Sequence, residues 1–560
     1  MLPLRLHWTQ RMRMNSRALG CSTVLSLLLS AIGSGAQTAR ATTAVPARTA
    51  AGYRTISEGD LRADLTFLSS DALQGRMSLE NGDAVAIEWI ASEFKKAGLK
   101  PAFGNSYVQP VPVVEYRADA AQSSIVLRRG GSEQKFAWAD ISGGFKRPVD
   151  ITAPVVFAGF GVSAPELGYD DYAGIDIKGK IALVFEHEPQ ESNPQSVFNG
   201  TGNTRHATNR VKALAAQSRG AVALLVVPEP NRTHLSNAQR VLRIGGSATR
   251  SLPPPSQALQ QDALDIPVLL VSDSVARELM KTVEITPARA QEIIDRDLKP
   301  QSRPLPDTDL SIHLRSQYAK EGITYNVGGL LEGSSPALRG ETIIISSHHD
   351  HDGMAAEGVW HGADDNGSGT VGVIAVARAF HANAAKPKRS VLFISFAAEE
   401  RGLLGAYFLA AHPVGDLATT RAMLNFDMIG RDEEPTPQTD GLIEIPKETS
   451  NRLNLIGAKY SPDYKRVVVA QNAAVGLVLD DRFDHESALN IFFRSDQFPF
   501  VLKNVPALWW FTGFHPDYHH VTDTADKINY TKMVKILKLA YLTAWVFGDT
   551  PTPPRFVSNP

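Results

Sequence analysis

The sequence has very little cysteine: Cys21 is the only one among 560 residues. Cys21 lies in an N-terminal segment that we expect the mature protein to lose, for reasons given below. The mature chain then has no thiol, which excludes disulfides, cysteine nucleophiles and cysteine metal ligands. A metal site in this protein must therefore be built from histidine and carboxylate side chains.

An excess of charge and long apolar runs are also missing. The chain has 57 Lys and Arg against 59 Asp and Glu, so no strong field draws it to nucleic acid or a membrane surface. Beyond the N-terminal segment, no stretch has the ~20 apolar residues of a spanning helix. The hydrophobic content of 43% is ordinary for a folded protein, and 560 residues are too many for one core. We expect two or three domains, no nucleic-acid partner and no integral membrane span.

The N-terminal segment has the parts of a secretory signal peptide. An apolar run, Cys21–Ile32, is followed by Ser34 and Ala36, which fit a small-x-small cleavage pattern. The basic residues that precede the run are Arg5, Arg11, Arg13 and Arg17. We expect residues 1–36 to be cleaved and the protein to be secreted or periplasmic; a transmembrane anchor is the alternative.

The second half of the chain alternates between strand and helix patterns. Strands are predicted at 341–347, 389–400, 421–430 and 505–513, and helices at 368–383 and 401–412, with a final helix after residue 530. This alternation indicates an α/β domain with a mixed, mostly parallel central sheet flanked by helices. Before it, short β runs between about 151 and 272 predict a β-rich insert without a catalytic cluster of residues.

Metal-ligand residue types collect where the predicted strands end. The tract "SSHHDHDG" (346–353) supplies His348 and Asp350, and "AAEE" supplies Glu399 and Glu400. The other strand ends and one loop before a helix supply Asp427, His519, His520, Asp364 and Asp365. In open α/β sheets, ligands bind beyond the carboxyl ends of the strands, so we expect these side chains to meet.

The chemistry of metal-dependent hydrolysis needs these residue types. A hydrolytic zinc site uses nitrogen and oxygen ligands with a position left for water. Two zinc ions ~3.5–4 Å apart need a bridging carboxylate, and a further carboxylate must take the proton of the water. Each motif alone has a simpler explanation: a polar loop, a solvated helix start, or a turn or calcium loop at "GADDNGSG". The calcium loop would need a later Glu at a fixed spacing, which is absent.

Taken together, the motifs resemble the co-catalytic di-zinc exopeptidases, of which bacterial leucyl aminopeptidases are typical. The matching motifs, in order, are His-x-Asp, "GADDNGSG", Glu-Glu, "NFDMIG" and "YHHVTDT". The block "GFGVSAPELGYDDYAGIDIKGKIALV" is similar to a protease-associated (PA) domain. The resemblance implies the zinc exopeptidase fold with an inserted β-rich PA domain. It also implies these boundaries: signal peptide 1–36, linker 37–52, peptidase domain 53–144 and 305–549, PA-like insert 145–295, and tail 550–560.

The resemblance implies a role for each site residue. His348 and Asp427 would bind one zinc ion, Glu400 and His519 would bind a second, and Asp365 would bridge both. Glu399 would be the catalytic general base, and Asp350 would hold the ring of His348. His348 and His519 are preferred over His349 and His520 by motif alignment, and His349 and His351 are left as pocket or supporting residues. A cis peptide bond is expected between Asp365 and Asn366.

The function implied is that of an exported metallo-aminopeptidase with two Zn2+ per chain, acting on peptides with a free N-terminus. Manganese or cobalt would suit the same ligands. The alternatives are a carboxypeptidase, with Arg494 to hold a terminal carboxylate, a glutaminyl cyclase, and a non-catalytic receptor on a peptidase scaffold. Aromatic residues near the last strand form either the core or an apolar substrate pocket: Phe498, Phe500, Trp509, Trp510 and Phe511. Sequence leaves the oligomeric state open.

Overall fold

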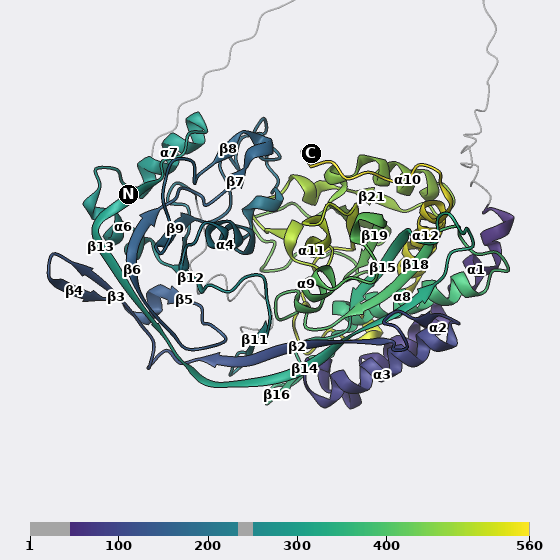
Figure 1. The fold of residues 1–560 in the computed structure, drawn as a ribbon. Coiled ribbons are helices and arrows are strands. Elements are labelled where there is room, and N and C mark those ends of the chain that lie inside the picture. Colours follow the sequence, from purple (N-terminus) through teal and green to yellow (C-terminus); the bar gives the residue numbers. More distant parts are fainter. Residues whose placement is uncertain (1–44, 233–249, 559–560) are drawn as a thin grey trace, which may run out of the picture. The chain divides into compact units, whose positions relative to one another are not determined.

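The computed structural model of the chain describes residues 45–232 and 250–558, which form two large sheets with their helices (Figure 1). The expected signal peptide, 1–36, lies outside these residues. The expected linker, 37–52, is helical where it is described: Ala47–Thr49 form a 3-10 turn and α1 covers Ala50–Thr55. This segment is tied to the rest of the chain, because the backbone N–H of Gly52 donates to Oδ1 of Asn383.

The first sheet has ten strands, of which four neighbours near its centre are parallel. Its order is β11 (Ser256–Leu259), β2 (Val108–Ala118), β14 (Ser316–Leu331), β18 (Ser390–Phe396), β15 (Thr342–His348), β19 (Thr420–Phe426), β22 (Ala507–Phe511), β20 (Arg452–Ile456) and β21 (Val478–Asp480), with β1 (Lys100–Pro101) paired to β14. Strands β18, β15, β19 and β22 are parallel. Antiparallel pairs adjoin them on both sides, β14 with β18 and β20 with β22. The predicted fold class, a mixed sheet with helices, is confirmed.

Successive side chains of a strand face opposite sides of the sheet, so each face has its own core. Ile343 and Ile345 of β15 pack into one cluster, whereas Ile344 belongs to another. The first cluster includes α2 (Glu58–Leu68), α3 (Asn81–Lys96), α8 (Gly369–His381), α10 (Pro462–Asn472) and α12 (Tyr530–Asp549). The second includes α9 (Leu404–Ala411) and α11 (Phe498–Val501). The central strands are therefore buried on both faces, and only their ends and loops can carry polar chemistry.

The second sheet has eight strands and its own core. Its order is β4 (Ser132–Lys135), β3 (Ser124–Arg129), β13 (Arg303–Leu314), β6 (Val149–Phe157), β9 (Ile181–Phe185), β10 (Ala223–Val227), β12 (Val268–Val271) and β5 (Ile141–Ser142). The helices of this region are α4 (Asn209–Ser218), α6 (Asp273–Leu279) and α7 (Pro287–Asp297). Two small hairpins complete the strands: β7 (Ser163–Ala164) with β8 (Tyr169–Asp170), and β16 (Met354–Ala355) with β17 (Gly358–Val359).

The two sheets exchange strands across the expected insert boundaries of 145–295. Strands β3, β4, β5 and β13 belong to the eight-stranded sheet although they lie outside that range. Conversely, β11 lies inside the range but pairs with β2 of the ten-stranded sheet. Only Arg315 separates β13 from β14, so the chain passes directly from one sheet into the other. Local sequence patterns do not reveal such long-range pairings.

Within residues 45–232 and 250–558, every helix is too short or too polar to cross a membrane.

Candidate metal centre

The chemistry-bearing residues lie beyond the carboxyl ends of the four parallel strands. His348 is the last residue of β15, and Asp427 directly follows β19. Glu399 and Glu400 lie three and four residues after Phe396, the end of β18. His519 lies in the loop after β22, and Asp365 lies just before α8. After β15 the chain adds β18 on one side of it and then β19 on the other side. Such a switch point leaves a crevice at the carboxyl ends of the strands.

The first group of side chains consists of His348, Asp365 and Asp427. Nε2 of His348 lies 3.5 Å from Oδ1 of Asp365 and 3.5 Å from Oδ1 of Asp427. This nitrogen is buried and has no hydrogen-bond partner. The other carboxylate oxygen of Asp427 accepts a hydrogen bond from the hydroxyl of Ser495. One nitrogen and two carboxylates, all aimed at the same point, suit a divalent cation of the zinc class.

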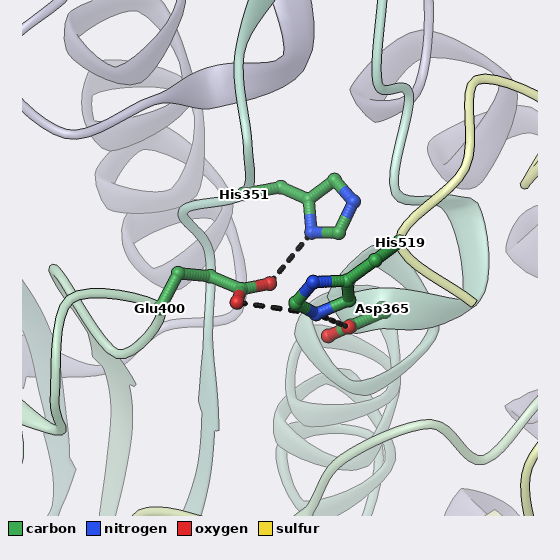
Figure 2. Close-up of side chains that lie close together, drawn as sticks. All are labelled: His351, Asp365, Glu400 and His519. Carbon is green, nitrogen blue, oxygen red and sulfur yellow. Dashed lines mark hydrogen bonds and ion pairs between the residues drawn. The ribbon is translucent and has the colours of Figure 1, made fainter. Parts of the chain in front are cut away.

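The second group consists of His351, Asp365, Glu400 and His519, shown in Figure 2. Nε2 of His519 lies 3.0 Å from Oδ2 of Asp365 and 3.2 Å from Oε2 of Glu400. The second oxygen of Glu400 lies 2.7 Å from Nδ1 of His351. All four side chains are buried or nearly so, and each offers one ligand atom within 4.8 Å of the others.

Asp365 belongs to both groups, and each group faces a different oxygen of its carboxylate. Its position is fixed by the backbone. The peptide bond from Asp365 to Asn366 is cis, as expected. The buried carboxylate of Asp523 accepts hydrogen bonds from the backbone N–H groups of Asp364 and Asp365, at 2.9 and 3.1 Å. A carboxylate held in this way can bridge two cations.

The carboxylates create a negative field that favours cations. Burial lowers the pKa of His348, but the charges of Glu399 and Asp427 outweigh it and raise that pKa well above its ordinary value. Likewise, burial lowers the pKa of His519, but the charges of Glu400 and Asp352 outweigh it and raise that pKa well above its ordinary value. A field that holds protons on two buried imidazoles also attracts divalent metal ions. Metal binding would release those protons, because the ring nitrogen must be free to bind metal.

Glu399 differs from the ligand carboxylates in its surroundings. Its Oε2 lies 3.8 Å from Nε2 of His348. Burial raises the pKa of Glu399 well above its usual value; the charge of His348 opposes the shift and the carboxylate of Asp496 adds to it. A raised carboxyl pKa suits a group that takes a proton and later returns it near neutral pH.

Asp350 supports the site differently from the sequence expectation. Nδ1 of His348 lies 3.2 Å from the main-chain oxygen of Asp350 and 3.8 Å from its carboxylate. The carboxylate itself accepts the backbone N–H of Glu399 at 2.9 Å and that of Glu400 at 3.3 Å. Asp350 therefore positions the turn that carries both glutamates, while its carbonyl faces the histidine ring.

Two further residues of the tract 346–353 lie at the site: His351, expected as a pocket or supporting residue, and Asp352, which the sequence did not single out. His351 adjoins Glu400, and Oδ2 of Asp352 lies 3.3 Å from Nδ1 of His519. His349 points away: its Nδ1 lies 3.1 Å from Oγ of Ser395 and its Nε2 lies 3.3 Å from Oδ1 of Asp83. His349, His351 and Asp352 all belong to the tract 346–353. The direction of each side chain follows from where β15 ends, at His348, which the sequence alone does not show.

A cavity of about 280 Å³ opens onto the two groups. Asp365, Glu399, Glu400, Asp427 and His519 line its polar side. Its other walls include Phe493, Trp509, Phe514 and Tyr518. Of the five aromatic residues expected near the last strand, Trp509 lines the cavity, whereas Phe498, Phe500, Trp510 and Phe511 are buried core.

Comparison with known families agrees with this geometry. The sequence model of peptidase family M28 matches residues 326–544, and that of the PA domain matches residues 151–279. The chain therefore contains a region similar to peptidase family M28, residues 326–544, and before it a region similar to the PA domain, residues 151–279.

Several curated proteins are similar to part of the chain. A probable leucine aminopeptidase of Arthroderma otae is 29% identical over 160 residues, which is 28% of this chain and 39% of that protein. Leucine aminopeptidase 2 of the same organism is 28% identical over 212 residues, 33% of this chain and 38% of that protein. The chain thus spans about two fifths of the length of these relatives.

Solved structures with a similar backbone fold include an aminopeptidase from Aneurinibacillus sp. strain AM-1. It is 18% identical, with a TM-score of 0.48, and the match covers 91% of this chain and 98% of that one. A zinc aminopeptidase from Bacillus subtilis is also 18% identical, with a TM-score of 0.41 and coverage of 90% and 96%.

Proposed function

We propose that this protein is an exported zinc-dependent aminopeptidase that removes N-terminal residues from peptides. The observation that carries the proposal is Asp365, whose two oxygens face two separate groups of histidine and carboxylate ligands, with Glu399 beside one of them. The match of residues 326–544 to peptidase family M28 and the similarity to leucine aminopeptidases support the reaction class.

Two zinc ions would be held by five side chains. His348 and Asp427 would hold one ion, Glu400 and His519 the other, and Asp365 both. When bound, the ions polarise the scissile carbonyl and lower the pKa of a bound water. His351 lies against Glu400 and leaves the second oxygen of that carboxylate facing His519. We therefore assign His351 a positioning role at the second ion.

Glu399 would act as the general base. Its raised pKa lets it accept the proton of the attacking water and then donate that proton to the amine that leaves. The substrate's free α-amine, which is positively charged, would lie among the carboxylates of the cavity. The aromatic wall, with Trp509 and Phe514, would contact the side chain of the first residue, so we expect a preference for apolar N-terminal residues.

The alternative activities predict different products. A carboxypeptidase would need basic residues for a terminal carboxylate; Arg494 lines the cavity and lies over the ring of Phe514, with Nη2 3.2 Å from the hydroxyl of Tyr518. A glutaminyl cyclase would convert N-terminal glutamine without hydrolysis. A non-catalytic receptor would bind peptides unchanged.

The test uses purified protein with added zinc and two peptides that differ only in acetylation of the N-terminus. Mass spectrometry follows the products. Stepwise loss of residues from the free N-terminus of one peptide alone is the expected result. Loss from the C-terminus of both peptides would establish a carboxypeptidase instead, and two intact peptides would contradict the proposed activity.

Export is proposed from the N-terminal sequence alone. The basic residues, the apolar run Cys21–Ile32 and the small residues before 37 support it. Expression of the full chain in a bacterial host, followed by fractionation and N-terminal sequencing, tests it. A protein that starts near Gln37 in the periplasm or medium is expected, and an uncleaved cytosolic protein would overturn export.

A further inference from the structure

A second cluster of metal-ligand residue types lies in the PA module, outside the catalytic centre. Glu186 and His187 directly follow β9, and Glu229 follows β10, the neighbouring parallel strand. One atom from each of the three side chains lies within 4.8 Å of the other two. The residues are 8%, 7% and 1% exposed, so the cluster is buried.

The cluster offers donors of the kind that bind zinc. Nδ1 of His187 lies 2.8 Å from Oε1 of Glu229, and the other oxygen of Glu229 is buried without a hydrogen-bond partner. A third glutamate, Glu191, has an oxygen 3.7 Å from the same histidine nitrogen and could serve as a fourth donor. Zinc commonly takes four nitrogen and oxygen ligands in a tetrahedral arrangement. Burying carboxylates at such distances is costly unless a cation compensates them.

Among the described residues, the cations that face the cluster are Lys212 and Arg232. The ammonium of Lys212 donates to the carbonyl of Phe185 at 2.7 Å, and burial lowers the pKa of Lys212 to about 8. Nη1 of Arg232 lies 2.8 Å from Nδ1 of His187 and contacts Glu191. The carboxylates of Glu186, Glu188, Glu191 and Glu229 outnumber these two cations. The side chain of Arg232 is 24% exposed, so it can turn to solvent when another cation binds.

A cavity of about 520 Å³ adjoins the cluster and reaches the peptidase domain. Glu191, Glu229 and Arg232 line it from the PA module, and Glu486 and Ser487 line it from the peptidase domain. It therefore gives an ion a route to Glu229.

We propose that Glu186, His187 and Glu229 form a binding site for a divalent cation of the zinc class, separate from the catalytic pair. The site lies where the PA module meets the peptidase domain, because Nε2 of His187 lies 2.7 Å from the side-chain amide of Asn490. A metal-bound histidine donates its other ring N–H to an oxygen, which Asn490 supplies if its amide turns over.

An ion at this site would restrict the movement of one wall of the substrate cavity. Asn490 directly precedes the turn Ile491–Phe493, and Phe493 and Arg494 line the cavity of the catalytic centre. An ion that fixes His187 therefore also fixes the start of this segment. We expect loss of the ion to raise KM severalfold while kcat stays within about twofold, because the catalytic ligands are not touched.

The decisive measurement is anomalous diffraction at the zinc edge on crystals of the full chain grown with zinc. The expected result is a peak among Glu186, His187 and Glu229, in addition to the peaks at Asp365. The catalytic peaks serve as an internal control for zinc loading. Catalytic peaks without a peak in the PA module would overturn the proposal, whereas the opposite pattern would contradict the proposed catalytic centre and leave this site standing.

Variants test the same site in solution by zinc content per chain after dialysis. Glu229→Gln should lose one ion. Its matched control is Glu166→Gln, which changes another glutamate 2.8 Å from a histidine, His206, in the same module. Among the described residues, that pair belongs to no three-ligand group, so the control should lose none. Arg232→Gln should keep the ion and bind it more tightly, because the competing guanidinium is gone. Zinc content in Glu229→Gln equal to that of the wild type and the other variants would refute the site.

Discussion

The carboxylate of Asp350 accepts the backbone N–H of Glu399 at 2.9 Å, which ties the segment after β15 to the segment after β18. The loop with the candidate ligand His348 and the proposed general base Glu399 are thereby held in one arrangement. Asp350 is fully buried, so water cannot replace this contact.

The first prediction concerns Asp350→Asn. The amide NH2 that replaces one oxygen cannot accept a backbone N–H, so the turn that carries Glu399 and Glu400 should shift. We expect kcat to fall about 10–100-fold, the range typical of groups that support metal ligands. Steady-state kinetics and circular dichroism check this, with Asp416→Asn, at an exposed helix cap, as the control. Wild-type kcat in the folded variant would show that Asp350 does not position the base.

The second prediction concerns Glu399→Gln. Glutamine keeps the shape of the side chain but cannot take a proton, so peptide hydrolysis should fall by about 10²–10⁴-fold. Zinc content should stay the same, because Glu399 is not assigned as a ligand. Glu357→Gln, at an exposed glutamate, is the control and should keep full activity. Hydrolysis by Glu399→Gln at the wild-type rate would refute the role of Glu399.

The third prediction separates two adjacent histidines. His348→Ala should lose one zinc ion and all but a trace of activity. His349→Ala should keep its zinc, because His349 faces Asp83 and Ser395. It should lower the melting temperature, since the buried carboxylate of Asp83 loses a partner. Zinc content and thermal unfolding of both variants decide it; loss of zinc in His349→Ala alone would reverse the ligand assignment.

The fourth prediction concerns Asp352, whose carboxylate faces Nδ1 of His519 at 3.3 Å. Burial raises its pKa, but the charges of His519 and Arg401 together with the contact to His519 outweigh burial and lower that pKa. Asp352→Asn removes the charge that orients the ring, so the second zinc ion should bind about 10–100-fold more weakly. Titration of activity against buffered zinc measures this, and saturating zinc should restore kcat. An unchanged zinc titration would contradict the role of Asp352.

The fifth prediction concerns pH and stability in the PA module. Burial raises the pKa of Asp171 to about 7, despite hydrogen bonds from Tyr169, Phe160 and Val162. Between the ordinary pKa of 3.8 and about 7, the unfolded chain has lost this proton and the folded chain keeps it. The contribution of Asp171 to stability is thus complete below about 3.8 and is lost as pH rises toward 7.

Asp171→Asn cannot titrate, so the melting temperature of wild type minus that of Asp171→Asn should decrease from pH 5 to pH 8. Asp176→Asn, at an exposed aspartate of the same module, should show a constant difference. A constant difference for Asp171→Asn as well would show that the buried carboxyl does not titrate in this range.

The sequence predicted the candidate metal centre better than the insert, for a physical reason. Strands buried on both faces leave an unbroken apolar run, and the polar residue that ends each run is visible in the sequence, as with His348 and Asp427. For His351 the sequence left a pocket role and a supporting role open, because beyond the strand end no periodicity fixes the direction of a side chain. The cluster of His187 and Glu229 was missed because 42 residues separate them and only the pairing of β9 with β10 brings them together.

The exchange of strands between the two sheets bears on how this protein can be divided. Deleting residues 145–295 would remove β11 from the edge of the ten-stranded sheet and expose the backbone of β2. The same deletion would remove β6, which links β3, β4 and β13 to the rest of the eight-stranded sheet. Exposed strand edges invite aggregation. The PA module is thus not an independent folding unit. We expect neither the PA module nor the peptidase domain to fold correctly without the other.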